Sequence, residues 1–328
     1  MRAAGVGGGL DRAWDWFTAR PHATRGLAVT RIVLGLIVWT QMLVNWPDRH
    51  YTWGDGAAWT SSVRDAKPWP GVLGIFQQAD GLTFDLLYLL TVVAGLLLMV
   101  GLWTRGAAVL TLFLWMSLYV SNPFVGSGGD AILRMVLLYA CFTDSGRHFS
   151  VDAWLRGRRG AVRPIVPPWL STTLHNLAVV LIIHQVVMVY VGSALWKVQS
   201  DVWMSGRAVY FPLQTEAYSP WRDLIHPFSS AEPIVLLATW TAIVVQLLFP
   251  VLLLYRSTRA LALVVVTGMH LGIGVFMGIM YFSLVMIAVD MMLVSDASWR
   301  RAGRWWRART ARNRRGREVR GQDESIGV

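Results

Sequence analysis

The sequence predicts an all-α membrane protein, a polytopic transmembrane helical bundle of about eight spans with its N-terminus and C-terminus in the cytoplasm. Hydrophobic residues make up 55% of the 328 residues and charged residues only 15%. A water-soluble shell of this size cannot bury so much apolar surface. The charges also gather in short segments between long apolar runs, so lipid is the expected solvent for most of the chain.

Eight apolar segments are long enough to be candidate crossings, taking about twenty residues for each. They cover 27–45, 82–102, 106–121, 130–143, 174–195, 233–254, 259–276 and 278–295. The fourth segment is short. The last two form one continuous apolar stretch that is too long for a single crossing, and Gly272, Gly274 and Gly278 give it a place to turn.

Arginines mark the side that faces the cytoplasm, because short cytoplasmic loops are enriched in basic residues. With the N-terminus inside, the inner segments hold Arg2, Arg12, Arg20, Arg25, Arg105, Arg147, Arg156, Arg158, Arg159, Arg163, Arg256, Arg259 and the tail from Arg300 to Arg320. We therefore divide the chain into a basic cytoplasmic segment (1–26), a transmembrane domain (27–296) and a basic cytoplasmic tail (297–328). The tail is expected to begin as an amphipathic Trp/Arg segment at the membrane surface and to end in disorder.

Several classes of protein are excluded or disfavoured. The formal charge of +11 lies in loops and at both ends instead of on one face, so no nucleic acid is expected as a partner. Residues 1–26 lack the pattern of a cleavable signal peptide. Cys141 is the sole cysteine and cannot form an internal disulfide. No metal-ligand spacing of histidines occurs, so no metal is expected, and the lack of an inverted repeat disfavours a transporter.

Lys197 is the first candidate for chemistry, at the outer end of the fifth predicted span. The chain uses Arg 28 times and Lys twice. An arginine would serve equally well as a structural anchor, but arginine does not lose its proton in a protein, whereas lysine can and then acts as a base. The alternative is an interfacial anchor beside Trp196.

A second candidate is the pair Asp130 and Arg134 at the start of the fourth predicted span. Residues four apart share one face of a helix. Asp130 follows Gly128 and Gly129 at a helix N-terminus, a place suited to an anion or a polar ligand. The alternative is a helix cap with its own salt bridge.

His270 in the seventh predicted span and His184 in the fifth are further candidates, because ionisable groups inside spans call for a partner or a function. Each can instead only hydrogen-bond a neighbouring helix. Arg31, early in the first span, is expected to be an inner anchor or a helix-packing residue. Aromatic outer loops would cover the outer polar residues, an arrangement that suits a ligand with a polar head and an apolar tail.

Taken together, these residues resemble a known family. The series runs in order along about 27–296 and comprises Leu27-Ala28-Val29 with Arg31 and Gly35, Gly101-Leu102 with Arg105, Phe142 and Asp144 before Ser150-Val151-Asp152, Leu174-His175-Asn176, Gly192 to Lys197 with Asp201 and Gly206, and His270 with Tyr281-Phe282-Ser283. It resembles the membrane domain of vitamin K-dependent γ-glutamyl carboxylase, called the HTTM domain in bacteria.

The resemblance implies a quinone cofactor. The carboxylase deprotonates reduced vitamin K, lets oxygen attack it, and uses the resulting base to remove a γ-proton from glutamate before carbon dioxide adds. Lys197 falls on the lysine that starts this reaction. We therefore expect Lys197 and His270 to be catalytic, and Asp130, Arg134, His184 and Trp196 to bind the cofactor.

The chain also departs from the carboxylase. Trp196-Lys197 stands where the carboxylase has two lysines, and Gly129 stands where it has a histidine. A basic tail follows the last span in place of a large lumenal portion. Carboxylation of a docked protein is thus less strongly implied than chemistry on a reduced quinone.

Two functional hypotheses follow for an integral membrane protein of the bacterial plasma membrane. The first is an enzyme, of the carboxylase (lyase) type, that uses reduced vitamin K or menaquinol with oxygen and carbon dioxide to modify an exported peptide or protein at the outer face. The alternative is a non-enzymatic membrane partner or maturation factor for an exported peptide. Membrane lipid and quinone are the expected small-molecule partners.

Overall fold

The computed structural model describes residues 7–66, 71–159, 166–218 and 220–309, and every regular element within them is helical. The all-α prediction is confirmed. Six helices are long and apolar enough to cross a membrane: α2 (Thr24–Val44), α6 (Gly81–Val100), α7 (Thr104–Ser121), α10 (Pro168–Lys197), α14 (Glu232–Leu252) and α15 (Arg256–Phe276). The chain is therefore an integral membrane protein.

The predicted fourth and eighth spans are shorter helices. α8 (Gly128–Ala140) has 13 residues and α16 (Met280–Asp290) has 11. At 1.5 Å per residue each is only about 16–20 Å long, against about 30 Å for a hydrocarbon core. α16 continues through η5 (Met291–Leu293), and the chain then bends by 100° into the helix Asp296–Arg309, a pair that makes a seventh span if counted as one. The structure thus supports six or seven spans where the sequence predicts about eight.

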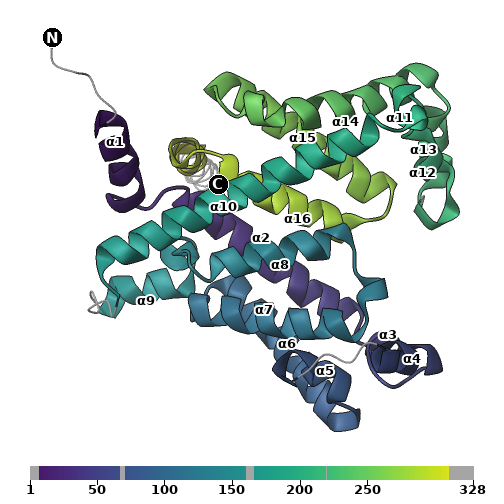
Figure 1. Ribbon diagram of the computed structural model, residues 1–328, viewed down its shortest axis with the longest axis horizontal. Coiled ribbons are helices and arrows are strands. Elements are labelled where there is room, and N and C mark those ends of the chain that lie inside the picture. The colour runs from purple at the N-terminus through teal and green to yellow at the C-terminus, as the bar shows by residue number, and fades with distance from the viewer. Residues whose placement is uncertain (1–6, 67–70, 160–165, 219, 310–328) are drawn as a thin grey trace, which may run out of the picture.

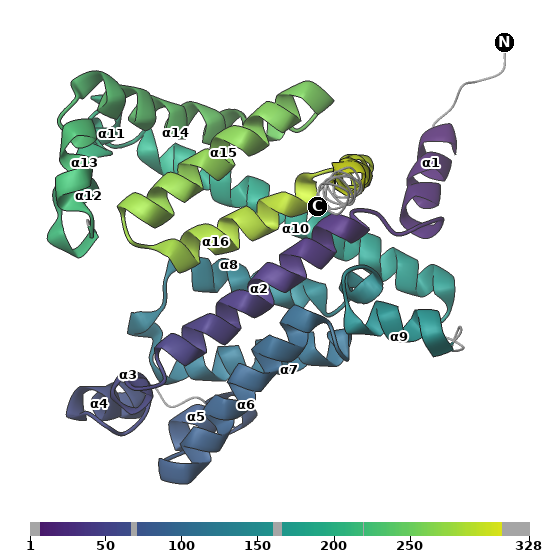
Figure 2. The same cartoon turned by 180° about the vertical axis from the view of Figure 1, so that it is seen from behind.

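α2 is central to the bundle (Figures 1 and 2). Figure 2 shows it running between α6 and α16, both of which pack against it. The approach to α6 is close because glycines face each other: a Cβ on Gly95 would lie 2.9 Å from the backbone nitrogen of Trp39. A Cβ on Gly35 would likewise collide with the backbone of Met99. Small residues at helix contacts are the usual solution inside membranes.

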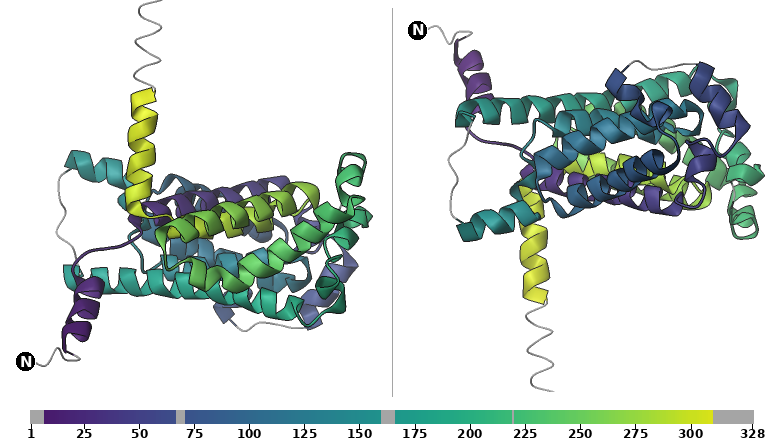
Figure 3. Two further views of the ribbon diagram at one scale, coloured as in Figure 1. Left: turned by 90° about the horizontal axis from the view of Figure 1, so that it is seen from above. Right: turned by 90° about the horizontal axis from the view of Figure 1, so that it is seen from below.

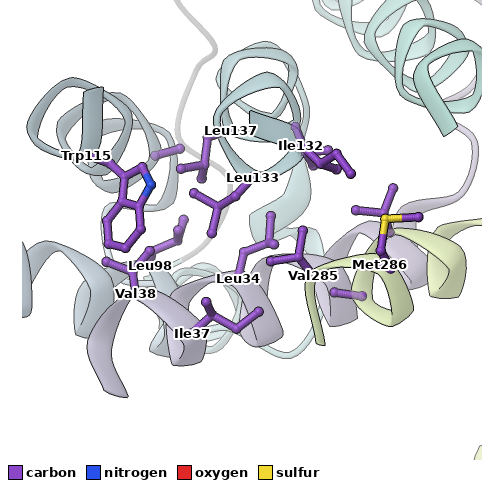
Figure 4. Packing of buried hydrophobic residues seen from close by; sticks show 14 of the residues in the cluster. Leu34, Ile37, Val38, Leu98, Trp115, Ile132, Leu133, Leu137, Val285 and Met286 are labelled. Carbon is purple, nitrogen blue, oxygen red and sulfur yellow. The ribbon is translucent and has the colours of Figure 1, made fainter. Parts of the chain in front are cut away.

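The apolar core lies around α2 and joins α6, α7, α8 and α16 (Figure 4). Leu34 and Ile37 of α2 are both 1% exposed, and Leu133 of α8 is fully buried. Val285 and Met286 bring α16 into the same cluster. α8 packs one side against α7, α10 and α16, so neighbouring helices hold this segment although it is too short to cross a membrane by itself.

The bundle has two chemically different ends (Figure 3). One end, which we call the basic end, holds α1 (Gly7–Thr18), α9 (Val151–Arg159), the turn between α14 and α15, and the helix Asp296–Arg309. The opposite end, the loop end, holds α3 (Arg49–Thr52), α4 (Ala58–Ala66), α5 (Ile75–Gln78), α11 (Asp201–Met204), α12 (Tyr210–Gln214) and α13 (Arg222–Ser229). Both ends of the described chain thus lie on one side. The predicted disorder of the last residues falls outside the described residues.

Arg31 joins several segments of the basic end through hydrogen bonds to their backbone. Its side chain is 3% exposed and donates to the carbonyls of Leu98 and Met99 at the end of α6, at 2.6 and 2.8 Å. It also donates to the carbonyls of Ser145 and Phe149, at 3.3 and 2.6 Å. These partners are carbonyls that a helix end or loop leaves unsatisfied. The packing role expected for Arg31 is confirmed.

Two further polar residues hold the same end by binding backbone groups. Asp152 accepts the backbone N–H groups of Trp103 and Thr104, at 2.9 and 2.8 Å, and so caps the start of α7. Asn176 binds the segment before α2: its amide donates to the carbonyls of Phe17 and Arg20, both at 2.9 Å. Arg31, Asp152 and Asn176, which belong to the series that carries the family resemblance, therefore stabilise the fold at this end.

Candidate functional site

Lys197 is the last residue of α10, at the loop end, and its ammonium group is half-buried. Nζ donates to Ser193 Oγ and to Gln246 Oε1, both at 2.6 Å. It also lies 4.9 Å from the centre of the Trp203 ring. Two membrane helices, α10 and α14, therefore fix the position of this nitrogen.

The groups that hold Lys197 are neutral. Throughout the described ranges no carboxylate forms an ion pair with Lys197; the salt bridges found there involve Arg49, His50 and Arg207. A buried cation normally has an acidic partner, because desolvation of an unpaired charge is costly. Neutral acceptors accommodate a lysine in either of its protonation states.

A second polar group lies deeper in the bundle, where α10, α15 and α16 meet. Tyr190 donates its hydroxyl proton to Asp290 Oδ2 at 2.6 Å, and its oxygen lies 3.1 Å from His270 Nε2. The three residues are 1%, 0% and 2% exposed, in the order Tyr190, Asp290, His270. Three ionisable side chains from three helices in an apolar interior are costly unless they serve a partner or a function.

When Asp290 is ionised, the hydrogen bonds in this triad determine the histidine tautomer. Because Tyr190 gives its own proton to Asp290, its oxygen can only accept from His270, which must then carry its proton on Nε2. His270 Nδ1 is left as an acceptor. It and Asp290 Oδ1 are buried atoms with no hydrogen-bond partner among the described residues. The triad thus presents a free base atom inside the bundle.

Lys197 and the triad are neighbours. Tyr190, Ser193 and Lys197 share one face of α10, at spacings of three and four residues. Gln246, which holds Lys197, also donates to the sulfur of Met269 at 3.7 Å, and Met269 precedes His270. The structure therefore brings together Lys197 and His270, the two residues expected to be catalytic.

Asp130 and Arg134 lie elsewhere, at the start of α8. Asp130 Oδ2 accepts the backbone N–H and the hydroxyl of Ser127, at 2.5 and 2.9 Å, and completes a capping box. Arg134 donates to the carbonyl of Asp130 at 3.2 Å and lies 3.6 Å from the centre of the Tyr119 ring. The two side chains share a helix face as predicted, but each has its own structural partner and their charged groups form no ion pair.

His184 and Trp196 point away from this cluster. His184 is exposed on α10, and Trp196 is 77% exposed beside Lys197. Neither contacts the triad in any interaction found for the described residues. For these two residues to bind a cofactor as predicted, the ligand would have to lie on the surface of α10 that faces away from the bundle.

Sequence reasoning missed Gln246, Tyr190 and Asp290. Asp290 is the sole acidic residue of the predicted span 278–295, so the criterion that selected His270 would also have selected it. Tyr190 and Gln246 carry no such signal, because a neutral polar side chain in a span is common at helix contacts. Within the described part of the chain, no group of three or more His, Cys, Asp or Glu side chains is placed to hold a metal ion.

Comparison with known proteins agrees with the resemblance in the sequence. The family model described as the HTTM domain matches residues 19–299. Searches of curated proteins and of solved structures gave no match. The matched range includes the six long helices, α8, α16 and both polar groups described above. The chain therefore belongs to the HTTM domain family.

Proposed function

We propose that this protein is a membrane enzyme that uses a reduced quinone, of the vitamin K hydroquinone or menaquinol type, with Lys197 as the base. Its site opens at the loop end of the bundle, which we assign to the outer face of the bacterial plasma membrane. With oxygen and carbon dioxide as co-substrates, it modifies an exported peptide or protein. The reaction class is that of the vitamin K-dependent carboxylases.

The observation that carries this proposal is the neutral setting of Lys197. Ser193 and Gln246 hold its nitrogen at 2.6 Å without an opposing charge. A carboxylate partner stabilises the charge of a purely structural cation, whereas a general base must be uncharged during part of the catalytic cycle. The setting of Lys197 suits a base.

The surroundings of Lys197 also fit a reduced quinone. The amine can take the proton of a ring hydroxyl, and the Trp203 ring beside Nζ offers a flat apolar face to an aromatic head group. Leu195 and Trp196, the preceding residues, are 49% and 77% exposed. In this proposal a lipid-soluble ligand reaches Lys197 from the membrane past these two exposed side chains. When bound, the reduced quinone would supply the electrons for the reaction with oxygen.

The proposal is tested by asking what the purified protein binds and oxidises. An experimental density map of the protein in lipid nanodiscs should show a tailed ligand whose head group ends beside Lys197. The same nanodiscs should oxidise added menaquinol, with the rate followed while oxygen and bicarbonate are supplied and withdrawn in turn. A site filled by phospholipid, together with no quinol oxidation above protein-free nanodiscs, would contradict the enzyme.

One observation favours the alternative, a non-enzymatic membrane partner for an exported peptide. Arg31, Asp152 and Asn176, which belong to the family series, bind backbone groups and so maintain the fold. A protein that kept only the fold would keep these residues. It would not need Lys197 in place of an arginine, which is the difference that separates the two hypotheses.

A further inference from the structure

We propose that Tyr190, His270 and Asp290 form a proton relay that receives the proton taken up by Lys197 and stores it on Asp290. This inference rests on the proposed function, in which Lys197 removes a proton from the bound quinol. A base that works repeatedly must lose the proton it has gained. Tyr190, the α10 residue of the relay, lies about two turns before Lys197 on the same face of that helix, and it contacts His270 and Asp290.

The hydrogen bonds of the triad fit both the empty and the loaded state. In the empty state His270 Nε2–H donates to Tyr190, and Tyr190 donates to Asp290 Oδ2. In the loaded state both directions reverse: protonated Asp290 donates to Tyr190, and Tyr190 donates to His270 Nε2. The same distances of 2.6 and 3.1 Å serve both states. No side chain has to leave its position.

The transfer balances at every atom. An N–H bond of Lys197 breaks and an N–H bond forms at His270 Nδ1, with a water molecule passing the proton and ending unchanged. The Nε2–H bond of His270 breaks as an O–H bond forms on Tyr190, and the original Tyr190 O–H bond breaks as one forms on Asp290. One proton enters and one is stored. No electrons are gained or lost, so no oxidant or reductant is needed.

Electrostatics favour this direction. An ammonium on half-buried Lys197 and a carboxylate on fully buried Asp290 are charges partly and wholly removed from water, and moving one proton between them removes both charges. Asp290 is fully buried, and its side-chain hydrogen bond comes from Tyr190 on α10, which in turn contacts His270 on α15. Lys197, seven residues after Tyr190 on α10, supplies the cation.

Time-resolved infrared spectroscopy tests the relay without any need for turnover. A flash releases protons from a photolabile acid around the protein in nanodiscs, and the carboxylic C=O band of Asp290, assigned by its loss in Asp290→Asn, reports when the proton arrives. His270→Gln and Tyr190→Phe should each slow its appearance by at least about tenfold, because a positioned acid–base group is typically worth more than that. His226→Gln, at an exposed histidine on α13, should leave the rate unchanged.

The outcomes separate the relay from the enzyme. Unchanged rates in both His270→Gln and Tyr190→Phe, or an Asp290 band that does not respond to the flash in the wild type, would overturn the relay. Thermal unfolding and the final amplitude of the Asp290 band show that each variant is folded with its acid in place. A protein that oxidises no quinol but still shows relay-dependent protonation contradicts the proposed function alone.

Discussion

Buried polar side chains differ in their hydrogen bonding between the two ends of this molecule. At the basic end, Arg31 and Asp152 have their hydrogen-bonding groups matched to backbone donors and acceptors. At the loop end and below it, His270 and Asp290 each keep a buried atom without a partner in the described residues. Satisfied groups stabilise a fold, whereas unsatisfied ones reduce stability and are kept where they have a use. Among the ionisable side chains of the described residues, this contrast distinguishes framework residues from the candidate site.

Arg31→Met should destabilise the protein strongly. The substitution leaves the carbonyls of Leu98, Met99, Ser145 and Phe149 without their shared donor, at a cost of about 3 kcal/mol or more in unfolding free energy, since each lost buried partner costs about 1–3 kcal/mol. Arg31→Lys should recover only part of the lost unfolding free energy, because lysine lacks the planar guanidinium group whose N–H donors reach several carbonyls. Thermal unfolding in detergent measures both. Arg256→Met, at an exposed arginine, is the matched control, and an equal effect there would contradict the framework role.

At the residue scale the sequence identified ionisable groups well and their partners poorly. Lys197 and His270 are visible because a span rarely tolerates them. Their partners are not, since Gln246 is 49 residues from Lys197 and Asp290 is 100 from Tyr190 along the chain. Contacts between distant helices depend on packing that periodicity does not encode. The shared face of Asp130 and Arg134 was predictable, but their separate partners were not.

At the scale of elements, hydropathy identifies apolar helices but does not show whether each one is long enough to cross a membrane. The predicted span 130–143 and the helix α8 (Gly128–Ala140) nearly coincide, so the helix itself was predicted correctly. Its contacts with α7, α10 and α16 bury one side of it, whereas Met135 and Leu138 are 36% and 41% exposed. A helix that packs against three others does not need the length of a full crossing, and its apolar composition is the same as that of a short crossing. Composition therefore counts eight segments where six are long enough to span.

The start of α7 should make stability depend on pH. Burial acts to raise the pKa of Asp152, but hydrogen bonds from the Thr104 hydroxyl and from the backbone N–H groups of Thr104 and Trp103 outweigh it and hold the pKa below its ordinary value. A depressed pKa means stability that is present above the unfolded-state pKa, about 4, and is lost as the pH falls through the folded-state pKa.

Asp152→Asn should therefore flatten the acid side of the stability profile. Thermal midpoints in detergent, measured from neutral pH down to about pH 3, should fall less steeply in this variant than in the wild type, and the variant should be the less stable one at neutral pH. Asp55→Asn, at an exposed carboxylate of the loop end, controls for general acid effects. Parallel curves for wild type and Asp152→Asn would mean that the cap contributes nothing.

At the scale of the whole molecule, the bundle is electrically one-sided. The basic end carries Arg105, Arg147, Arg156, Arg256 and the arginines of the helix Asp296–Arg309, and both ends of the described chain lie there (Figure 3). In the orientation that we propose, the basic end lies in the cytoplasm, as the positive-inside rule predicts, and Lys197 faces outward. The site would meet an exported substrate without a path through the membrane.

Reporter fusions test this orientation. Those placed after Arg105, Arg159, Arg256 and at the C-terminus should be cytoplasmic, and those at Asp65 and Glu216 should be external, because the former lie at the basic end and the latter at the loop end. An alkaline phosphatase and a fluorescent protein, active on opposite sides, give each position two readings. An external C-terminus would reverse the bundle and remove the outward site.

Lys197→Arg is the most direct test of the claim that Lys197 is the base. Arginine keeps the positive charge and can bind Ser193 and Gln246, but it cannot lose its proton near neutral pH. Quinol oxidation in nanodiscs should fall by about 100-fold or more, as far as in Lys197→Ala, because a general base is worth about 10²–10⁴ in rate. Lys67→Arg, at the only other lysine, should keep full activity, and all variants should insert equally. A Lys197→Arg protein that retains more than about a tenth of the wild-type rate loses too little for a missing base and would contradict the account.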